Sequence, residues 1–143
     1  MYRKILVALE NGPADQTLLP HVTRLAGELK SELLLLHVAD GWAARNFDKL
    51  KLAESDEMKA DLAYLEEQAD LVRKKGLKVS VLLALGDPPR EILKAAEDKH
   101  CDLIAMTGHG HRLIGDLLLG STIHEVRHKT SLPVLVLRAV PGS

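Results

Sequence analysis

Five short, nearly continuous apolar runs constrain the fold of this chain more than any other feature of its sequence. Turn residues such as glycine, proline and aspartate bound the runs, and apolar residues recur at helical spacing between them. A short apolar run without polar alternation is typical of a strand covered on both faces, as in a parallel sheet. The predicted strands are residues 5–9, 33–38, 79–85, 103–106 and 133–137.

Because these runs alternate with helical segments, each strand is predicted to be connected to the next by a helix. We therefore predict an α/β fold, a doubly wound, five-stranded parallel sheet with helices on both faces, which is a Rossmann-like architecture. Residues 42–57 are charged and lack a clear period, so they are predicted to form a loop that leads into a helix. The chain has 143 residues and no linker, so residues 1–143 are predicted to form a single domain.

Charge and composition narrow the classes of partner. The net charge of -1 argues against a nucleic-acid binder with a basic face, and an aromatic content of 3% leaves little material for base stacking. Cys101 is the only cysteine, which excludes an intrachain disulfide and favours a reducing compartment. The N-terminal apolar run is too short for a signal peptide, and no run is long enough to span a membrane. We expect a cytoplasmic protein without membrane insertion.

The stretch from Met106 to Thr122 connects a predicted buried strand to a helix that starts at about Ser121, and it contains four glycines. Glycine lets the backbone approach a ligand closely, and the N–H groups at a helix start attract anions. The sequence therefore predicts a phosphate cradle. It is not a Walker loop, because the Gly-Lys-Ser/Thr ending is missing.

In doubly wound sheets, ligands bind beyond the carboxyl ends of the strands, at the point where the strand order reverses. This rule predicts that three segments share one rim: Glu10 with Asn11, residues 38–40, and the loop after Met106.

With these features the chain resembles the universal stress protein family over essentially its whole length. The strongest match is the glycine-rich loop, since nucleotide-binding members carry Gly, two residues, Gly, nine residues, then Gly-Ser or Gly-Thr. Gly110 and Gly120-Ser121 match the later parts of this motif. The first glycine is displaced by one place: Thr107 occupies its position and Gly108 follows, which is predicted to supply backbone freedom. Glu10 stands where such members usually have aspartate.

The resemblance implies an adenine-nucleotide alpha hydrolase-like fold that binds ATP, or ADP or AMP. The adenine would lie near the first two strands and the phosphates in the loop, and Mg²⁺ could be held by phosphates and water. The predicted binding residues are Ala8, Leu9, Glu10, Val38, Met106, Thr107, Gly108, Gly110, His111, Arg112, Gly120, Ser121 and Thr122.

The resemblance also implies a homodimer. The strand at Val134 to Leu137 is predicted to lie at a sheet edge, where a bare apolar strand would promote aggregation unless a second copy covers it. The leading interpretation is an ATP- or adenine-nucleotide-binding universal stress protein that acts as a stress-response sensor or regulator with an unknown regulatory protein partner.

Two alternatives remain open at the level of sequence. One is an enzyme that slowly hydrolyses ATP or transfers its phosphate, with Asp116 or His109 as the only candidate bases. The other is a nucleotide-free dimeric interaction protein. No catalytic residue is assigned. His109 and His111 raise the question of zinc, but no carboxylate is arranged around them and no metal ligand is assigned.

Three further predictions concern single side chains and one charged segment. His37 lies inside an apolar strand and is predicted to be packed and hydrogen-bonded. Asp87 is predicted to cap the helix that starts near Pro88. The acidic residues between 54 and 70 are predicted to form a solvated helix face.

Overall fold

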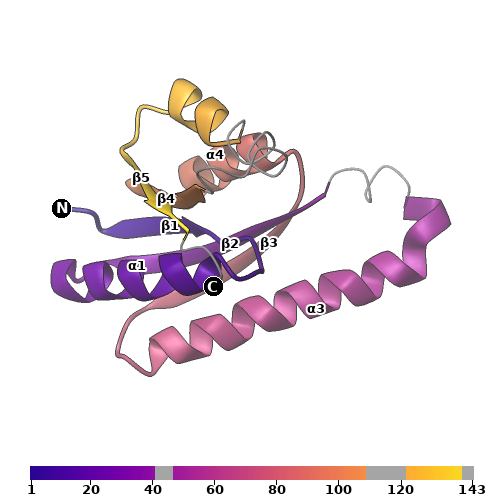
Figure 1. Cartoon of the computed structure of the whole chain (residues 1–143), viewed down its shortest axis with the longest axis horizontal. Helices are drawn as coiled ribbons and strands as arrows, with labels where there is room; N and C mark the ends of the chain where they lie inside the picture. The colour runs from indigo at the N-terminus through magenta and orange to yellow at the C-terminus, as the bar shows by residue number, and fades with distance from the viewer. Residues whose placement is uncertain (41–46, 109–121, 140–143) are drawn as a thin grey trace.

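A computed structural model describes residues 1–40, 47–108 and 122–139 of the chain (Figure 1). Strands and helices alternate along it, as the apolar runs predict. The elements are β1 (Lys4–Ala8), α1 (Asp15–Leu29), β2 (Glu32–Asp40), α3 (Phe47–Arg73), β3 (Val79–Gly86), α4 (Pro88–Asp98), β4 (Leu103–Gly108), a helix over residues 122–129, and β5 (Val134–Arg138).

All five strands are parallel, and their order in the sheet is β3-β2-β1-β4-β5. β1 is central: Ile5 is paired with Leu33 of β2 on one side and with Leu103 of β4 on the other. The chain adds strands on one side of β1 up to β3 and then crosses to the other side with β4. The order therefore reverses between β1 and β4, and the predicted doubly wound α/β fold is confirmed.

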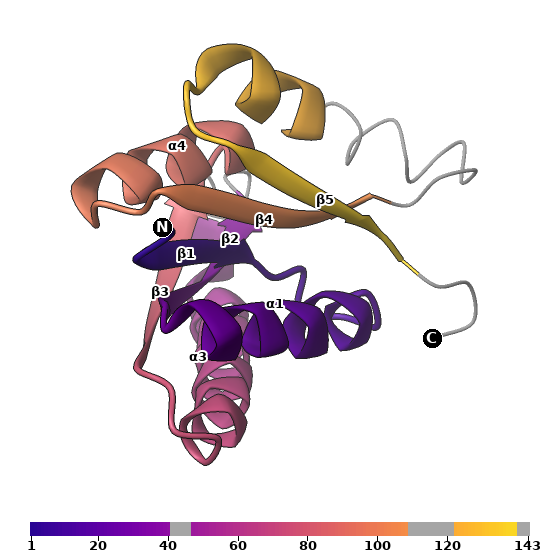
Figure 2. The same ribbon diagram turned by 90° about the vertical axis from the view of Figure 1, so that its left-hand side faces the viewer.

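Helices cover both faces of the sheet. Figure 2 shows α1 and α3 on one face, and α4 with the helix over residues 122–129 on the other. Successive residues of β2 belong to opposite clusters: Leu33 and Leu35 pack in the core towards α1 and α3, whereas Leu34 packs in the core towards α4. All three are at most 1% exposed, which explains why this strand has no polar alternation.

The predicted loop over residues 42–57 is wrong in its second part, because α3 begins at Phe47. The segment from Phe47 to Glu57 contains two lysines, two leucines and two glutamates, and neither glycine nor proline. Intrinsic propensity therefore favours a helix there without an apolar stripe that a periodicity argument would detect.

The start of α4 agrees with the prediction only in part. Asp87 occupies the position before the first helical residue, with φ −78° and ψ 119°, and Pro88 starts the helix. The Asp87 carboxylate makes no capping hydrogen bond, so its predicted capping role is wrong.

None of the helices in the described part of the chain is both long and apolar enough to cross a bilayer.

Candidate functional site

A cavity of about 620 Å³ lies at the carboxyl ends of β1, β2 and β4, where the strand order reverses. Its position agrees with the rule that ligands bind at such a switch point. The lining residues are Ala8, Leu9, Glu10, Leu36, His37, Val38, Asp87, Pro88, Pro89, Ile92, Met106, Thr107, Thr122, Ile123 and Glu125.

Most of the predicted site residues in the described part of the chain meet in this cavity. They are Ala8, Leu9, Glu10, Val38, Met106, Thr107 and Thr122. Gly108 ends β4 without lining the cavity. Five further predicted residues, Gly110, His111, Arg112, Gly120 and Ser121, lie outside the described residues.

The start of α4 is a part of the cavity wall that the sequence analysis missed. Asp87, Pro88 and Ile92 line the cavity beside β2 and β4. A signal for it was present, because Gly86-Asp87-Pro88 follows a predicted strand whose carboxyl end belongs to the same rim.

A side-chain hydrogen bond joins the ends of β1 and β4. Thr107 Oγ1 donates to Glu10 Oε2 at 2.9 Å, and Thr107 is only 4% exposed. These two residues are the two departures from the family pattern, and they contact each other. The longer side chain at position 10 thus meets the hydroxyl at position 107.

Gly108 does not have the role predicted for it. Its backbone is that of an ordinary strand residue, paired with Arg138 of β5, and it does not take the positive φ in which glycine is favoured. A Cβ added at Gly108 would lie 3.3 Å from Cγ1 of Val136. Close packing against β5, rather than backbone freedom, is therefore the reason for a glycine here.

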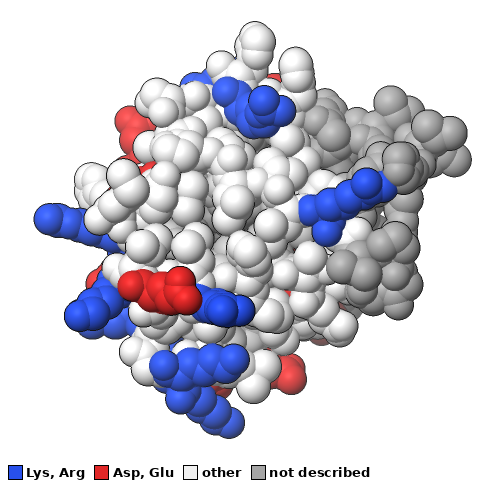
Figure 3. Space-filling view, turned by 60° about the vertical axis from the view of Figure 1, so that its left-hand side comes forward, with Lys and Arg blue, Asp and Glu red and all other residues white. Residues whose placement is uncertain are grey.

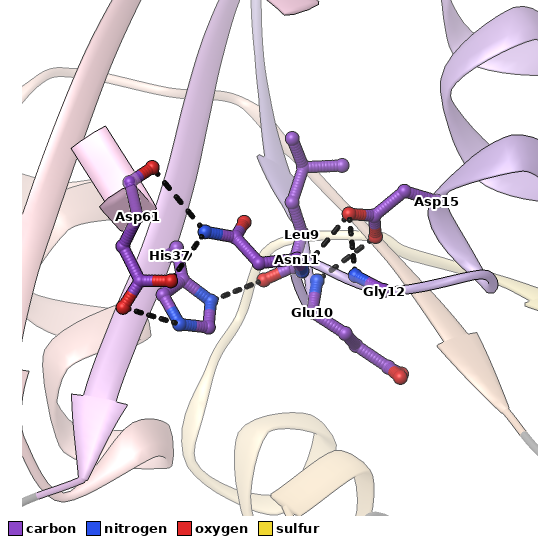
Figure 4. Close-up of polar contacts among 7 residues, drawn as sticks. All are labelled: Leu9, Glu10, Asn11, Gly12, Asp15, His37 and Asp61. Carbon is purple, nitrogen blue, oxygen red and sulfur yellow. Dashed lines mark hydrogen bonds and ion pairs between the residues drawn. The ribbon is translucent and has the colours of Figure 1, made fainter. Parts of the chain in front are cut away.

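The loop between β1 and α1 is organised by the carboxylate of Asp15, which is only 2% exposed. Oδ1 accepts a hydrogen bond from the backbone N–H of Glu10 at 2.9 Å. Oδ2 accepts bonds from the N–H groups of Asn11 and Gly12 at 2.9 and 3.4 Å (Figure 4). The Tyr64 hydroxyl donates to the same oxygen at 2.8 Å.

Burial shifts the pKa values of both Asp15 and Tyr64. It raises the pKa of the Asp15 carboxyl above its ordinary value, because lost solvation outweighs the hydrogen bonds that favour the charged form. Burial and the neighbouring Asp15 carboxylate also raise the pKa of Tyr64 well above its usual range. The Tyr64 hydroxyl therefore keeps its proton at neutral pH and remains a donor.

A second polar cluster joins the same loop to α3 and β2 (Figure 4). Asn11 Nδ2 donates to the carbonyl oxygen of Asp61 at 3.3 Å and to its Oδ1 at 3.1 Å. His37 Nδ1 lies 3.0 Å from the Leu9 carbonyl, and its Nε2 lies 3.8 Å from Asp61 Oδ2. Because a carbonyl oxygen only accepts hydrogen bonds, the proton of this contact is on Nδ1.

This cluster confirms one prediction and corrects another. His37 is packed and hydrogen-bonded, as predicted. The prediction of a uniformly solvated acidic face is wrong for Asp61, whose side chain is 22% exposed and faces the loop. Asp15 and Tyr64, which sequence reasoning did not single out, likewise support the loop.

Basic side chains and possible metal ligands outside the cavity bear on two of the predictions. On the face shown in Figure 3, Lys and Arg side chains stand in separate groups among uncharged and acidic residues. His124 and His128 stack on each other, with ring centroids 5.3 Å apart. Among the residues that the structure describes, no three histidine, cysteine or acidic side chains are grouped to hold a metal ion. His109, His111 and Asp116 lie outside those residues.

Comparisons with known proteins agree with this architecture. A sequence model of the universal stress protein family matches residues 1–138. A universal stress protein of Methanocaldococcus jannaschii is 29% identical over 158 aligned residues, which cover 96% of each chain. The solved structure of that archaeal protein superposes with a TM-score of 0.79 at 32% identity and covers 99% of both chains.

More distant solved structures share the fold. A universal stress protein in complex with cAMP has a TM-score of 0.71 at 17% identity, covering 97% of this chain and 98% of its own. A universal stress protein of Archaeoglobus fulgidus in complex with dAMP has a TM-score of 0.65 at 22% identity, covering 94% and 97%. Because the family model matches residues 1–138, this chain belongs to the universal stress protein family.

Proposed function

We propose that this protein binds an adenine nucleotide in the cavity where the strand order reverses. The observation that carries the proposal is the cavity itself, because its volume of about 620 Å³ and its lining suit such a ligand. Ligand sites typically enclose roughly 300–1,000 Å³ and combine apolar walls with a few polar groups.

The parts of the cavity match the parts of a nucleotide. Val38, Ile92 and Met106 offer apolar surface to the faces of a base. Glu10 lies between the carboxyl ends of β1 and β4, where its carboxylate is suited to accept hydrogen bonds from ribose hydroxyls. Its carboxylate would repel phosphates, so the phosphates belong at a distance from it.

Two helices border the cavity, and they differ in the donors they offer to phosphates. The first two residues of α4, Pro88 and Pro89, have no backbone N–H, so this helix start is poor in donors. Thr122 and Ile123, at the first described turn of the helix over residues 122–129, line the cavity and have N–H groups, and Thr122 adds a hydroxyl. We therefore assign the phosphates to this second helix and to the glycine-rich segment before it.

The identity of the nucleotide and the role of the protein are further parts of the proposal, and proteins of the same fold support them. Two proteins with this fold were solved with cAMP and dAMP, which supports an adenine nucleotide as the ligand. We propose ATP as the physiological ligand, with Mg²⁺ coordinated by its phosphates and water. We further propose a sensing or regulatory role for the nucleotide-bound protein, which its membership of the universal stress protein family supports.

The test begins with the purified protein. Denaturation followed by chromatography should release an adenine nucleotide, and calorimetric titration of nucleotide-free protein should show that ATP with Mg²⁺ binds more tightly than GTP. Glu10→Ala should weaken ATP binding by roughly ten- to hundredfold, the effect of losing hydrogen bonds to a charged group.

The matched control is Glu28→Ala. Glu28 lies on α1, its side chain is 69% exposed, and within the described structure its carboxylate pairs only with Arg24, at 3.8 Å. This variant should bind ATP as the wild type does. If no adenine nucleotide is released, and ATP produces neither heat nor a thermal shift, the proposed function is wrong.

We also propose that two copies pair through β5. This strand is at a sheet edge, as predicted, and Val136 is 40% exposed there. A two-fold dimer would place the two β5 strands side by side and cover both apolar edges. Val136→Lys should then convert a dimer to a monomer in light scattering, and a wild-type monomer at micromolar concentration would contradict the proposal.

A further inference from the structure

Helix α3 holds the loop between β1 and α1 at two points. Tyr64 donates to the Asp15 carboxylate, which in turn accepts hydrogen bonds from the backbone of Glu10 and Asn11. Asp61 accepts two hydrogen bonds from the side-chain amide of Asn11. Residues three apart on a helix project from the same side, so Asp61 and Tyr64 reach the loop together.

The loop between β1 and α1 contains a backbone conformation that is unfavourable without stabilising contacts. Asn11 has φ 57°, in the left-handed region that most residues avoid, although asparagine tolerates it better than others. Both its backbone N–H and its side-chain amide are bonded to partners supplied by helices α1 and α3. Losing these bonds would let the loop relax to a more common conformation.

Glu10 is fixed at both ends as a result. Its backbone N–H donates to Asp15 at 2.9 Å, and its carboxylate accepts from Thr107 at 2.9 Å. The preceding carbonyl, that of Leu9, contacts His37, whose other ring nitrogen faces Asp61. Every residue from 9 to 11 is thus connected to α3, directly or through one intervening side chain.

We propose that Asp61 and Tyr64 are positioning residues of the nucleotide site, which act through Asn11 and Asp15 to hold Glu10 where it contacts the ligand. This inference rests on the proposed function. It also makes α3 the element that regulates the site: a change in how α3 packs against the loop changes nucleotide affinity. By thermodynamic reciprocity, a bound nucleotide stabilises the packing of α3 on the loop.

A double-mutant cycle separates positioning from a general structural role. Tyr64→Phe removes one oxygen atom, and Asp61→Ala removes the carboxylate acceptor of Asn11 while it keeps the backbone carbonyl. Each should weaken ATP binding by roughly three- to thirtyfold in calorimetric titrations, the usual range of coupling through intervening residues. In a Glu10→Ala background the same changes should have no further effect on the dissociation constant, because they act through Glu10.

Two further variants test whether the loss of affinity is specific to the hydrogen bonds on the loop. Asp61→Asn keeps an oxygen that can accept the bond from Asn11 and should restore most of the affinity lost in Asp61→Ala. Asp70→Ala is the matched control on α3, since the Asp70 side chain is 67% exposed and pairs only with Arg73 in the described structure. It should leave ATP binding unchanged.

Hydrogen exchange provides a readout that needs no nucleotide. In ligand-free protein, the backbone amides of Glu10 and Asn11 should exchange faster in Tyr64→Phe than in the wild type, while those of β1 residues such as Leu6 keep their protection. Unchanged exchange at both amides would overturn the proposal even if a variant lowers global stability.

The outcomes distinguish this inference from the function on which it rests. If the wild type binds no nucleotide, the proposed function fails. If the wild type binds ATP but the variants keep its affinity, or weaken it equally with and without Glu10, the function stands and the positioning role is refuted.

Discussion

Replacing Asp15, the first residue of α1, by alanine should strongly destabilise the loop between β1 and α1. The carboxylate accepts four hydrogen bonds, three from backbone N–H groups and one from Tyr64. A hydrogen bond to a charged acceptor contributes about 1.5–3 kcal/mol, so four of them set an upper limit of roughly 6–12 kcal/mol.

Two effects reduce this limit. The unfavourable burial of the carboxylate disappears together with its side chain. The freed N–H groups of Glu10, Asn11 and Gly12 are only partly buried and can recover bonds to water. We therefore expect Asp15→Ala to lower the free energy of unfolding by about 2–4 kcal/mol, as for other broken buried networks. That is a large fraction of the roughly 5–15 kcal/mol that stabilises a typical domain.

Urea denaturation followed by far-ultraviolet circular dichroism measures this loss. The midpoint should shift and the slope should not, because the surface exposed on unfolding stays the same. Glu28→Ala, also an acidic residue of α1, is the control and should lower stability by less than about 0.5 kcal/mol, since its ion pair is exposed. A loss below about 1 kcal/mol in Asp15→Ala would refute the view that this carboxylate holds the loop.

Three further outcomes follow from the same structure. Because burial raises the pKa of Asp15, the part of its contribution to stability that depends on protonation is full below the unfolded value of 3.8 and is lost as the pH rises through the folded value. The advantage of the wild type over Asp15→Asn in urea midpoints should thus be larger at about pH 3.5 than at about pH 7, and a reversed trend would contradict this reasoning. Gly108→Ala should destabilise by about 1 kcal/mol, because its Cβ would lie 3.3 Å from Val136, whereas Gly12→Ala has open space around it and should not destabilise in the same assay. Cys101 is 6% exposed and burial raises its pKa to about 11, so the thiol should react with Ellman's reagent only as fast as the protein unfolds; immediate reaction of folded protein would refute this.

The strands and the layer arrangement could be predicted from the sequence because every strand is a short apolar run and the inner strands are covered on both faces. Leu33 to Leu36 are all buried, so the run contains no polar residue between them. The rim of the sheet could be predicted as well, because the carboxyl ends of parallel strands lie on the same side. The helical start of α3 could not be predicted from periodicity, since residues 47–57 have helix-forming composition without a clear apolar stripe.

Some residues of the candidate site could likewise be predicted from the sequence, and others could not. Glu10, Val38 and Met106 could be assigned because each lies at the end of a recognisable strand. Asp61 could not, because an acidic residue within a charged helix is indistinguishable in sequence from its solvated neighbours. Its role depends on which turn of α3 packs against the loop, and that contact spans 50 positions of the chain.

The sequence by itself determined the α/β class, the buried strands and the rim at which the candidate cavity lies, because these follow from local patterns of apolar residues and from the geometry of parallel sheets. Only the tertiary structure decided how the rim is built. The bond between Thr107 and Glu10 joins residues 97 positions apart, and the bond between Tyr64 and Asp15 joins residues 49 apart. Such pairs form because packing brings their elements together, and no local pattern of residues records that proximity.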